Sequence, residues 1–173
     1  MMFKDSDYSA LSRAEFWKKV STDLYHLLSP DDHQITILAN TAAFLGQAIQ
    51  NINWCGFYLF DGGKLFLGPF CGKPACTEIQ LGNGVCGAAA TRKEIVVVDD
   101  VATFPGHIVC DGDSRSEIVL PLLHHRGELF GVLDIDSPLL SRFNSSDIKG
   151  LEQVRDLLMR KLLASNTTLF PQT

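Results

Sequence analysis

The chain lacks any long hydrophobic run. No apolar stretch in its 173 residues approaches the roughly 18 that a membrane-spanning helix needs. The first ten residues, MMFKDSDYSA, contain no apolar segment like that of a secretory signal. We therefore expect no membrane association and a cytoplasmic location.

Positive charge is also scarce. The 15 Lys and Arg residues are outnumbered by 20 Asp and Glu residues, which gives a net charge of -5. Phosphate backbones are bound by basic surfaces, so nucleic acid is not an expected partner. Hydrophobic residues make up 46% of the chain, and its length favours one domain over residues 1–173.

No two cysteines are spaced as Cys-x-x-Cys, the pair that structural zinc sites usually contain, so we expect no metal. Five cysteines in a cytosolic chain seldom form a structural disulfide framework, which favours catalysis or redox chemistry. Cys55 is interpreted as a small buried apolar side chain. The other four cysteines lie between Pro69 and Glu117: Cys71, Cys76, Cys86 and Cys110.

Apolar periodicity predicts an α+β fold. Helical spacing indicates helices within residues 12–50, the first capped by Ser12 and Glu15, and a C-terminal helix over about 145–164. Residues 53–137 contain about six strand-like segments joined mostly by hairpin turns. We expect a mainly antiparallel sheet with the N- and C-terminal helices packed on one face.

The glycine-rich stretch Leu81–Gly87 is predicted to be a loop that could open a helix at Ala88. Cys76 and Cys86 would then lie in flexible or glycine-flanked segments. Either thiol could swing to meet an oxidised Cys110. Pro121, inside a strand pattern, indicates a sheet edge or a bulge.

Side-chain alternation places Asp134 and Asp136 on one face of the last strand, and Trp54 and Tyr58 on one face of the first. The acids could simply face solvent. They could instead form, with Glu117, a site for a cationic group such as an ammonium, where an acid held protonated could donate a proton. The Trp54 ring could contact a methyl group or a cation.

Cys110 is the candidate nucleophile because it lies in a polar loop just before a strand. A reactive cysteine must be accessible and must reach its thiolate form. His107 and Arg115 would favour the thiolate, whereas Asp111 and Asp113 would oppose it. The sequence leaves this balance open.

An ordered set of motifs resembles the free methionine-(R)-sulfoxide reductases, which are single GAF-domain enzymes. The resemblance runs from the first predicted helix to the last. The motifs are WCGFYL (54–59), LGPF (67–70), GKPAC (72–76), GVCG (84–87), FPGHI (104–108), CD (110–111), SRSEI (114–118) and GVLDIDS (131–137).

The resemblance implies a role for each thiol. The cysteine that matches Cys110 attacks the sulfoxide sulfur and becomes a sulfenic acid, and the one that matches Cys76 resolves it as a disulfide. The one that matches Cys86 can take part, and thioredoxin restores the thiols. Two positions depart from the family pattern: Cys71 stands where glutamine is expected and Cys55 where a plain apolar residue is expected. Cys71 could compete as the resolving thiol.

The resemblance also implies that Glu117, Asp134 and Asp136 hold the substrate and assist proton transfer, while Trp54 and Tyr58 line the pocket. It implies a homodimer with thioredoxin as reductant and no cofactor. The alternatives are a ligand- or redox-sensing GAF module without turnover and a zinc-stabilised interaction domain.

Overall fold

The computed structural model describes residues 7–108, 111–165, 167 and 169. The helices in this part of the chain are α1 (Arg13–Leu27), α2 (Gln34–Ala48), α3 (Gly84–Arg92) and α4 (Ser145–Ala164), with a 3-10 turn at Val101–Thr103. The strands are β1 (Trp54–Phe60), β2 (Lys64–Cys71), β3 (Glu78–Gln80), β4 (Val96–Val98), β5 (Ser116–Leu123) and β6 (Leu129–Ser137).

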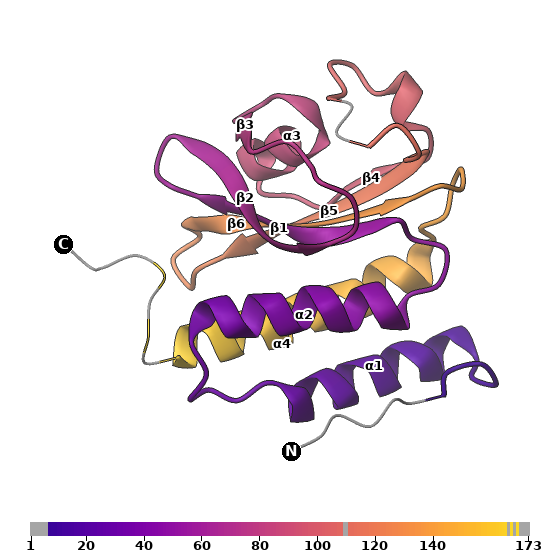
Figure 1. Cartoon of the computed structure of the whole chain (residues 1–173), viewed down its shortest axis with the longest axis vertical. Coiled ribbons are helices and arrows are strands. Elements are labelled where there is room, and N and C mark those ends of the chain that lie inside the picture. The colour runs from indigo at the N-terminus through magenta and orange to yellow at the C-terminus, as the bar shows by residue number, and fades with distance from the viewer. Residues whose placement is uncertain (1–6, 109–110, 166, 168, 170–173) are drawn as a thin grey trace.

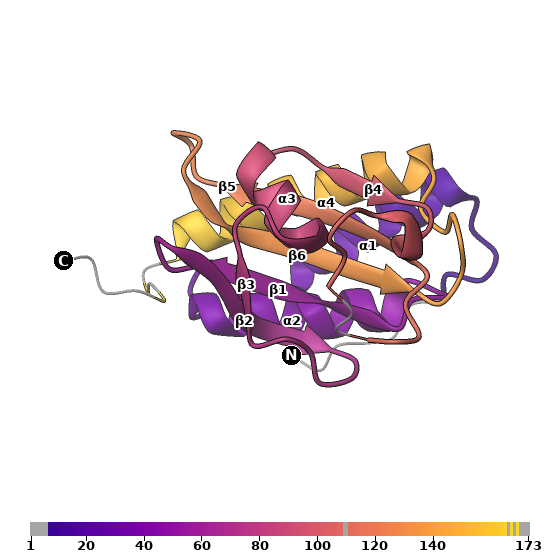
Figure 2. The ribbon, with the colours of Figure 1, turned by 90° about the horizontal axis from the view of Figure 1, so that it is seen from above.

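These strands form one sheet in the order β3-β2-β1-β6-β5-β4, and every neighbouring pair is antiparallel. Helices α1, α2 and α4 lie on one side of the sheet, and α3 lies on the other (Figures 1 and 2). The predicted α+β fold, with the terminal helices on one face of an antiparallel sheet, is confirmed. No helix in the described residues is both long and apolar enough to cross a membrane.

One apolar cluster packs against each face of the sheet. On β1, Cys55, Phe57 and Leu59 pack toward the helices, whereas Trp54 and Tyr58 belong to the cluster on the α3 side. The alternation predicted for β1 is confirmed. Side chains that alternate along a strand thus divide this sheet into a helix-covered face and a face available for a site.

A buried carboxylate joins α1 to α4. Asp147 is 1% exposed, accepts a hydrogen bond from Trp17 Nε1 at 3.1 Å, and pairs with Arg13 and Arg142. It also completes a capping box at the start of α4. A Cβ on Gly150 would lie 2.1 Å from the Trp17 ring, so glycine is what allows α1 to approach α4 this closely.

The prediction for the glycine-rich stretch was wrong. Helix α3 begins at Gly84, before the expected Ala88, and Cys86 is buried in its first turn. A Cβ on Gly87 would lie 2.4 Å from the Gln80 carbonyl oxygen, so this glycine serves close packing. Cys86 is therefore held in a helix and cannot swing on a flexible segment.

The expectation for Pro121 is confirmed. In the described residues, β4 pairs only with Glu117–Val119, so β5 is an edge strand where Pro121 lies. The register with β6 shifts just beyond, between Leu122 and Leu123. A proline, which lacks a backbone N–H, is tolerated at such a position.

Candidate active site

Three carboxylates gather on the α3 face of β5 and β6. Glu117 is the direct cross-strand partner of Asp136, and Asp134 lies two residues along on the same face. Glu117 is 5% exposed and Asp134 is 6% exposed. The alternative that this face of the sheet is open to solvent is therefore wrong, because α3 and the loops cover it.

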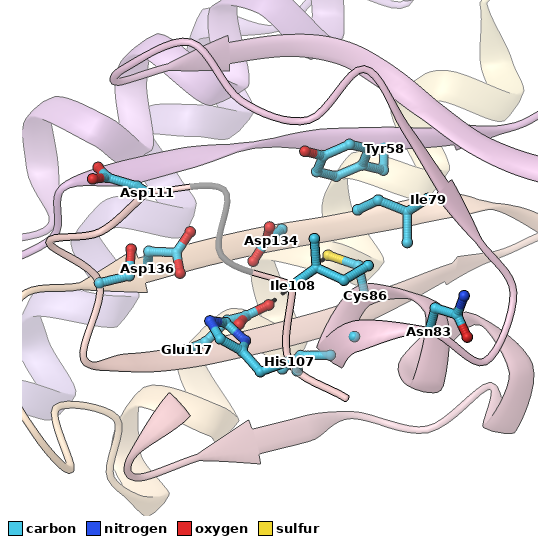
Figure 3. A pocket seen from close by; sticks show the side chains of 13 residues that line it. Tyr58, Ile79, Asn83, Cys86, His107, Ile108, Asp111, Glu117, Asp134 and Asp136 are labelled. Carbon is cyan, nitrogen blue, oxygen red and sulfur yellow. Dashed lines mark hydrogen bonds between the residues drawn. The ribbon is translucent and has the colours of Figure 1, made fainter. Parts of the chain in front are cut away.

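The acids line a cavity. Figure 3 shows Glu117, Asp134 and Asp136 on the strands below it, Cys86 at its side and His107 and Ile108 beside it. Sheet, helix and loop all contribute to the wall. The full lining in the described part of the chain is Tyr58, Ile79, Asn83, Gly84, Val85, Cys86, His107, Ile108, Asp111, Ser114, Glu117, Asp134 and Asp136.

Burial separates the protonation states of the acids. Loss of solvation, followed by repulsion from Asp134 and Asp136, raises the pKa of Glu117 well above its ordinary value. Burial also raises the pKa of Asp134, but hydrogen bonds with Cys86 and Glu117 limit the rise to about 6. Of this pair, Glu117 is therefore the acid that holds its proton more strongly and Asp134 the one that ionises first.

The pKa of Asp136 is raised, like that of Glu117. Burial and then the charge of Asp134 raise its pKa, while a hydrogen bond with Ser114 opposes the rise. Like charges this close do not all ionise together in a dry site. A bound cation would relieve this repulsion and favour the ionised form of both aspartates.

Asp134 also has an unmet hydrogen-bonding need. Its Oδ1 atom is buried and has no hydrogen-bond partner in the part of the chain that the structure describes. A buried acceptor without a partner is costly, and it calls for an explanation such as a missing donor. Asp134 lines the cavity, so a ligand with N–H groups that binds there would have this carboxylate as an acceptor.

Cys86 lies beside the acids. Its Sγ is 3.9 Å from Glu117 Oε1. Burial and then the charges of Asp134 and Glu117 raise the pKa of the Cys86 thiol well above its ordinary value. Cys86 is thus a protonated thiol and a poor nucleophile, because the thiolate is the reactive form.

One group of possible metal ligands occurs among the described residues. It consists of Cys86, Glu117 and Asp134, whose ligand atoms lie within 4.8 Å of one another. A metal ion there would have to displace the protons that Cys86 and Glu117 hold.

The two aromatic residues of β1 have different positions. Tyr58 lines the cavity, and its hydroxyl donates to the Cys76 carbonyl oxygen at 3.0 Å. Trp54 is absent from the described lining. It stacks on Tyr58 with ring centroids 5.9 Å apart and on Phe70 at 5.4 Å, and its Nε1 donates to the Lys73 carbonyl oxygen. Trp54 therefore supports Tyr58 and the segment that leads to Cys76.

Cys110, the predicted nucleophile, lies outside the described residues. Ile108 and Asp111, on either side of it in sequence, both line the cavity. Asp111 accepts a hydrogen bond from Asn53 Nδ2 at 3.0 Å and pairs with Lys73. The backbone N–H of Asp113 and then these partners hold the pKa of Asp111 below its ordinary value.

The other cysteines fall into two groups. Cys76 is disulfide-bonded. Cys55, Cys71 and Cys86 are free, and only Cys71 of these three is exposed.

Outside the strands, the sequence singled out Cys86 and His107 but not the other lining residues. Asp111 and Ser114 lie in the polar loop beside Cys110 and within the family motifs CD and SRSEI, but nothing in the sequence placed their side chains in the cavity wall. Asn83 and Val85 lie at the start of α3, where the glycine-rich sequence predicts a loop and the structure has a helix. Strand alternation finds residues on a sheet, but it carries no information about which loop or helix end covers them.

Comparison with known proteins supports one family. The family model described as "GAF domain" matches residues 33–162. The chain is 41% identical over 160 residues to the free methionine-R-sulfoxide reductase of Escherichia coli, covering 92% of this chain and 96% of that protein. It is 38% identical over 157 residues to the free methionine-R-sulfoxide reductase of Saccharomyces cerevisiae, covering 87% of each.

A solved structure agrees with these relatives. The free methionine-R-sulfoxide reductase of Neisseria meningitidis, determined in complex with its substrate, superposes with a TM-score of 0.86 at 39% identity. The match covers 95% of this chain and 98% of that one. The chain therefore belongs to the free methionine-R-sulfoxide reductases, an oxidoreductase family built on the GAF domain.

Proposed function

We propose that the protein reduces free L-methionine-(R)-sulfoxide to L-methionine with its own thiols, and that thioredoxin recycles it. The observation that carries the proposal is the buried group of acids in which Asp134 is charged, Glu117 holds a proton and one carboxylate oxygen is orphaned. The related proteins from E. coli and S. cerevisiae, which are named for this activity, support the proposal.

The acids explain a preference for the free amino acid. The substrate ammonium donates to Asp134 Oδ1, and Asp136 adds a second carboxylate on the same strand face. A hydrogen bond between charged groups contributes about 1.5–3 kcal/mol. A methionine sulfoxide inside a peptide has no ammonium, so it would leave these carboxylates buried and unpaired.

The chemical step transfers oxygen from the substrate to a thiol. Cys110 attacks the sulfoxide sulfur while Glu117 donates its proton to the sulfoxide oxygen, and the hydroxyl ends on Cys110 as a sulfenic acid. The substrate sulfur gains the two electrons that the cysteine sulfur loses. The positions of Ile108 and Asp111 in the cavity wall support this role for Cys110.

Cys76 resolves the sulfenic acid. Its thiol attacks the Cys110 sulfur, a disulfide forms and water leaves. The disulfide-bonded state of Cys76 supports this assignment over Cys86, which is buried and free, and over Cys71, which is free. Two thiols of thioredoxin then reduce the disulfide by exchange.

The proposal also includes a homodimer, a cytoplasmic location and no cofactor. Size-exclusion chromatography with light scattering measures the first, and metal analysis of the purified protein tests whether Cys86, Glu117 and Asp134 hold an ion.

The decisive experiment is a coupled assay in which thioredoxin, thioredoxin reductase and NADPH recycle the enzyme. We expect NADPH oxidation with free L-methionine-(R)-sulfoxide, and none above background with the S epimer or with a sulfoxide inside a peptide. Comparable rates with the peptide substrate would contradict the role given to the ammonium. Absence of turnover with every thiol reductant would favour a sensing module instead.

A further inference from the structure

Two free cysteines lie directly opposite each other, away from the carboxylates. Cys55 on β1 is the cross-strand partner of Cys71 on β2. Directly opposed residues of antiparallel strands have Cα atoms about 4.5–5.5 Å apart. This separation falls within the roughly 4.4–6.8 Å that a disulfide requires.

Both side chains lie on the helix-covered face of the sheet. Cys55 belongs to the apolar cluster under α2, and Cys71 shares its face because the two residues are register partners. A Cβ on Gly46 of α2 would lie 3.0 Å from Cys71 Sγ, which shows that the Cys71 side chain reaches toward this helix. The acids Glu117 and Asp134 lie on the opposite face.

The two thiols differ in access. Cys71 is exposed, whereas Cys55 is completely buried. Burial is the largest cause that raises the pKa of Cys55, and the charges of Asp134, Cys71 and Asp136 add to it. Cys71 is thus the thiol that an oxidant in solvent reaches first. Cys55 is the buried, protonated thiol beside it.

We propose that Cys55 and Cys71 form a second redox pair, which hydrogen peroxide converts into a cross-strand disulfide on the α2 face. Peroxide oxidises the Cys71 thiol to a sulfenic acid and releases one water. The Cys55 sulfur then displaces the hydroxyl, which leaves as a second water with the Cys55 proton. Two thiols supply the two electrons that reduce one peroxide. The pair is independent of the function proposed above.

The disulfide would protect the exposed thiol. A sulfenic acid without a partner oxidises further to a sulfinic acid, which is irreversible in most proteins. Capture by Cys55 stops Cys71 at a reducible stage. It also links β1 to β2 just before Gly72 and Lys73, on the segment that leads to Cys76.

The test is to count thiols after treating the fully reduced protein with excess peroxide and then denaturing it. The chain has five thiols. If the Cys55–Cys71 and Cys76–Cys110 disulfides both form, we expect only the Cys86 thiol to survive. Three survivors that include Cys55 and Cys71 would overturn the proposal. Peptide mass spectrometry identifies a Cys55–Cys71 link, and dithiothreitol should reverse it.

Two variants make the outcome specific. In Cys55→Ala, Cys71 should progress to a sulfinic acid, and a dimedone adduct should trap its sulfenic stage. In Cys71→Ser, Cys55 should remain an unmodified thiol, because peroxide does not reach it in the folded protein. The proposal fails if wild-type Cys71 reaches the sulfinic acid while Cys55 stays a free thiol.

Discussion

At the scale of single residues, Glu117 and Asp134 show how burial can give two neighbouring acids different tasks. Glu117 keeps its proton because desolvation and two nearby carboxylates raise its pKa. Asp134 ionises more readily because Cys86 and Glu117 form hydrogen bonds with it. Pairs of acids whose pKa values are pushed apart in this way often serve as the proton donor and the charged partner of a catalytic site.

The two acids should respond differently to amide substitution. Glu117→Gln removes the transferable proton, so we expect kcat to fall about 100-fold or more, in line with general acid catalysis. Asp134→Asn removes the charge that binds the ammonium, so we expect KM to rise about 10- to 150-fold. Steady-state kinetics of both variants, with exposed Glu128→Gln as a control, tests this division. Equal effects on KM in both variants would contradict it.

The pH profile of kcat/KM should have two limbs. As pH falls through about 6, Asp134 gains a proton and loses its attraction for the ammonium, so kcat/KM falls. As pH rises, Glu117 loses the proton it must donate, and kcat/KM falls again. Asp134→Asn should remove or displace the acidic limb. An unchanged limb in this variant would assign it to another group, such as the Cys110 thiol.

At the scale of elements, the sequence predicted strands better than the glycine-rich helix start. Alternation was enough to assign Trp54 and Tyr58 to one face of β1, and Asp134 and Asp136 to one face of β6, and the register then places both sets on the same face of the sheet. It could not show that α3 begins at Gly84, since glycine usually marks loops. Gly87 instead allows a close backbone contact with Gln80, which depends on the folded structure.

Gly56 illustrates such a contact at the site. It lies between Trp54 and Tyr58 on the same face of β1, and a Cβ there would meet Phe70 Cβ at 2.4 Å and the Trp54 ring at 2.6 Å. The glycine therefore leaves the space in which the Trp54 ring stacks.

Gly56→Ala should destabilise the fold by about 1–3 kcal/mol through overpacking, and it should lower activity because Trp54 can no longer support Tyr58. Urea unfolding and steady-state kinetics measure the two effects. Gly63→Ala is the control, because its Cβ would have Asp61 Oδ1 as nearest neighbour at 3.7 Å. The same urea midpoint for both variants would show that the Trp54 stack tolerates the methyl group.

At the scale of the whole molecule, the acids of the site oppose folding. The folded-state pKa of Asp134, about 6, lies above its ordinary value of 3.8, so the folded protein binds more protons than the unfolded chain between these values. Stability should therefore fall as pH rises from about 4 through 6, by on the order of 2–3 kcal/mol from this group.

Asp134→Asn removes this cost, and we expect it to be more stable than wild type at pH 7.5 and nearly equal to it at pH 4. Urea unfolding of the reduced, ligand-free proteins at both pH values measures the difference. A variant that is less stable than wild type at pH 7.5 would mean that the Asp134 charge is already compensated in the free enzyme.

On the helix-covered side of the sheet, a buried carboxylate should stabilise the fold instead of opposing it. Asp147 is buried where α1 meets α4, and there it accepts from Trp17 Nε1 at 3.1 Å and from Arg142 at 3.0 Å while also pairing with Arg13. Replacing one partner of a buried ion pair leaves the other charge uncompensated, which costs about 3–5 kcal/mol. We therefore expect Asp147→Asn to lower the unfolding free energy by about this amount. Asp156→Asn is the control, because its ion pair with Arg155 is largely exposed and contributes about 1 kcal/mol or less.

The kinetics of Asp147→Asn should be normal at a temperature where the variant is folded. Helices α1 and α4 lie on the other side of the sheet from α3 (Figure 1), and α3 contributes to the cavity wall. Urea unfolding and steady-state rates at 15 °C separate the two effects. Loss of turnover with an unchanged unfolding curve would mean that the helical layer positions the site. Normal turnover with reduced stability would assign the two faces of one sheet to separate tasks, with folding dependent on the helix side and chemistry on the α3 side.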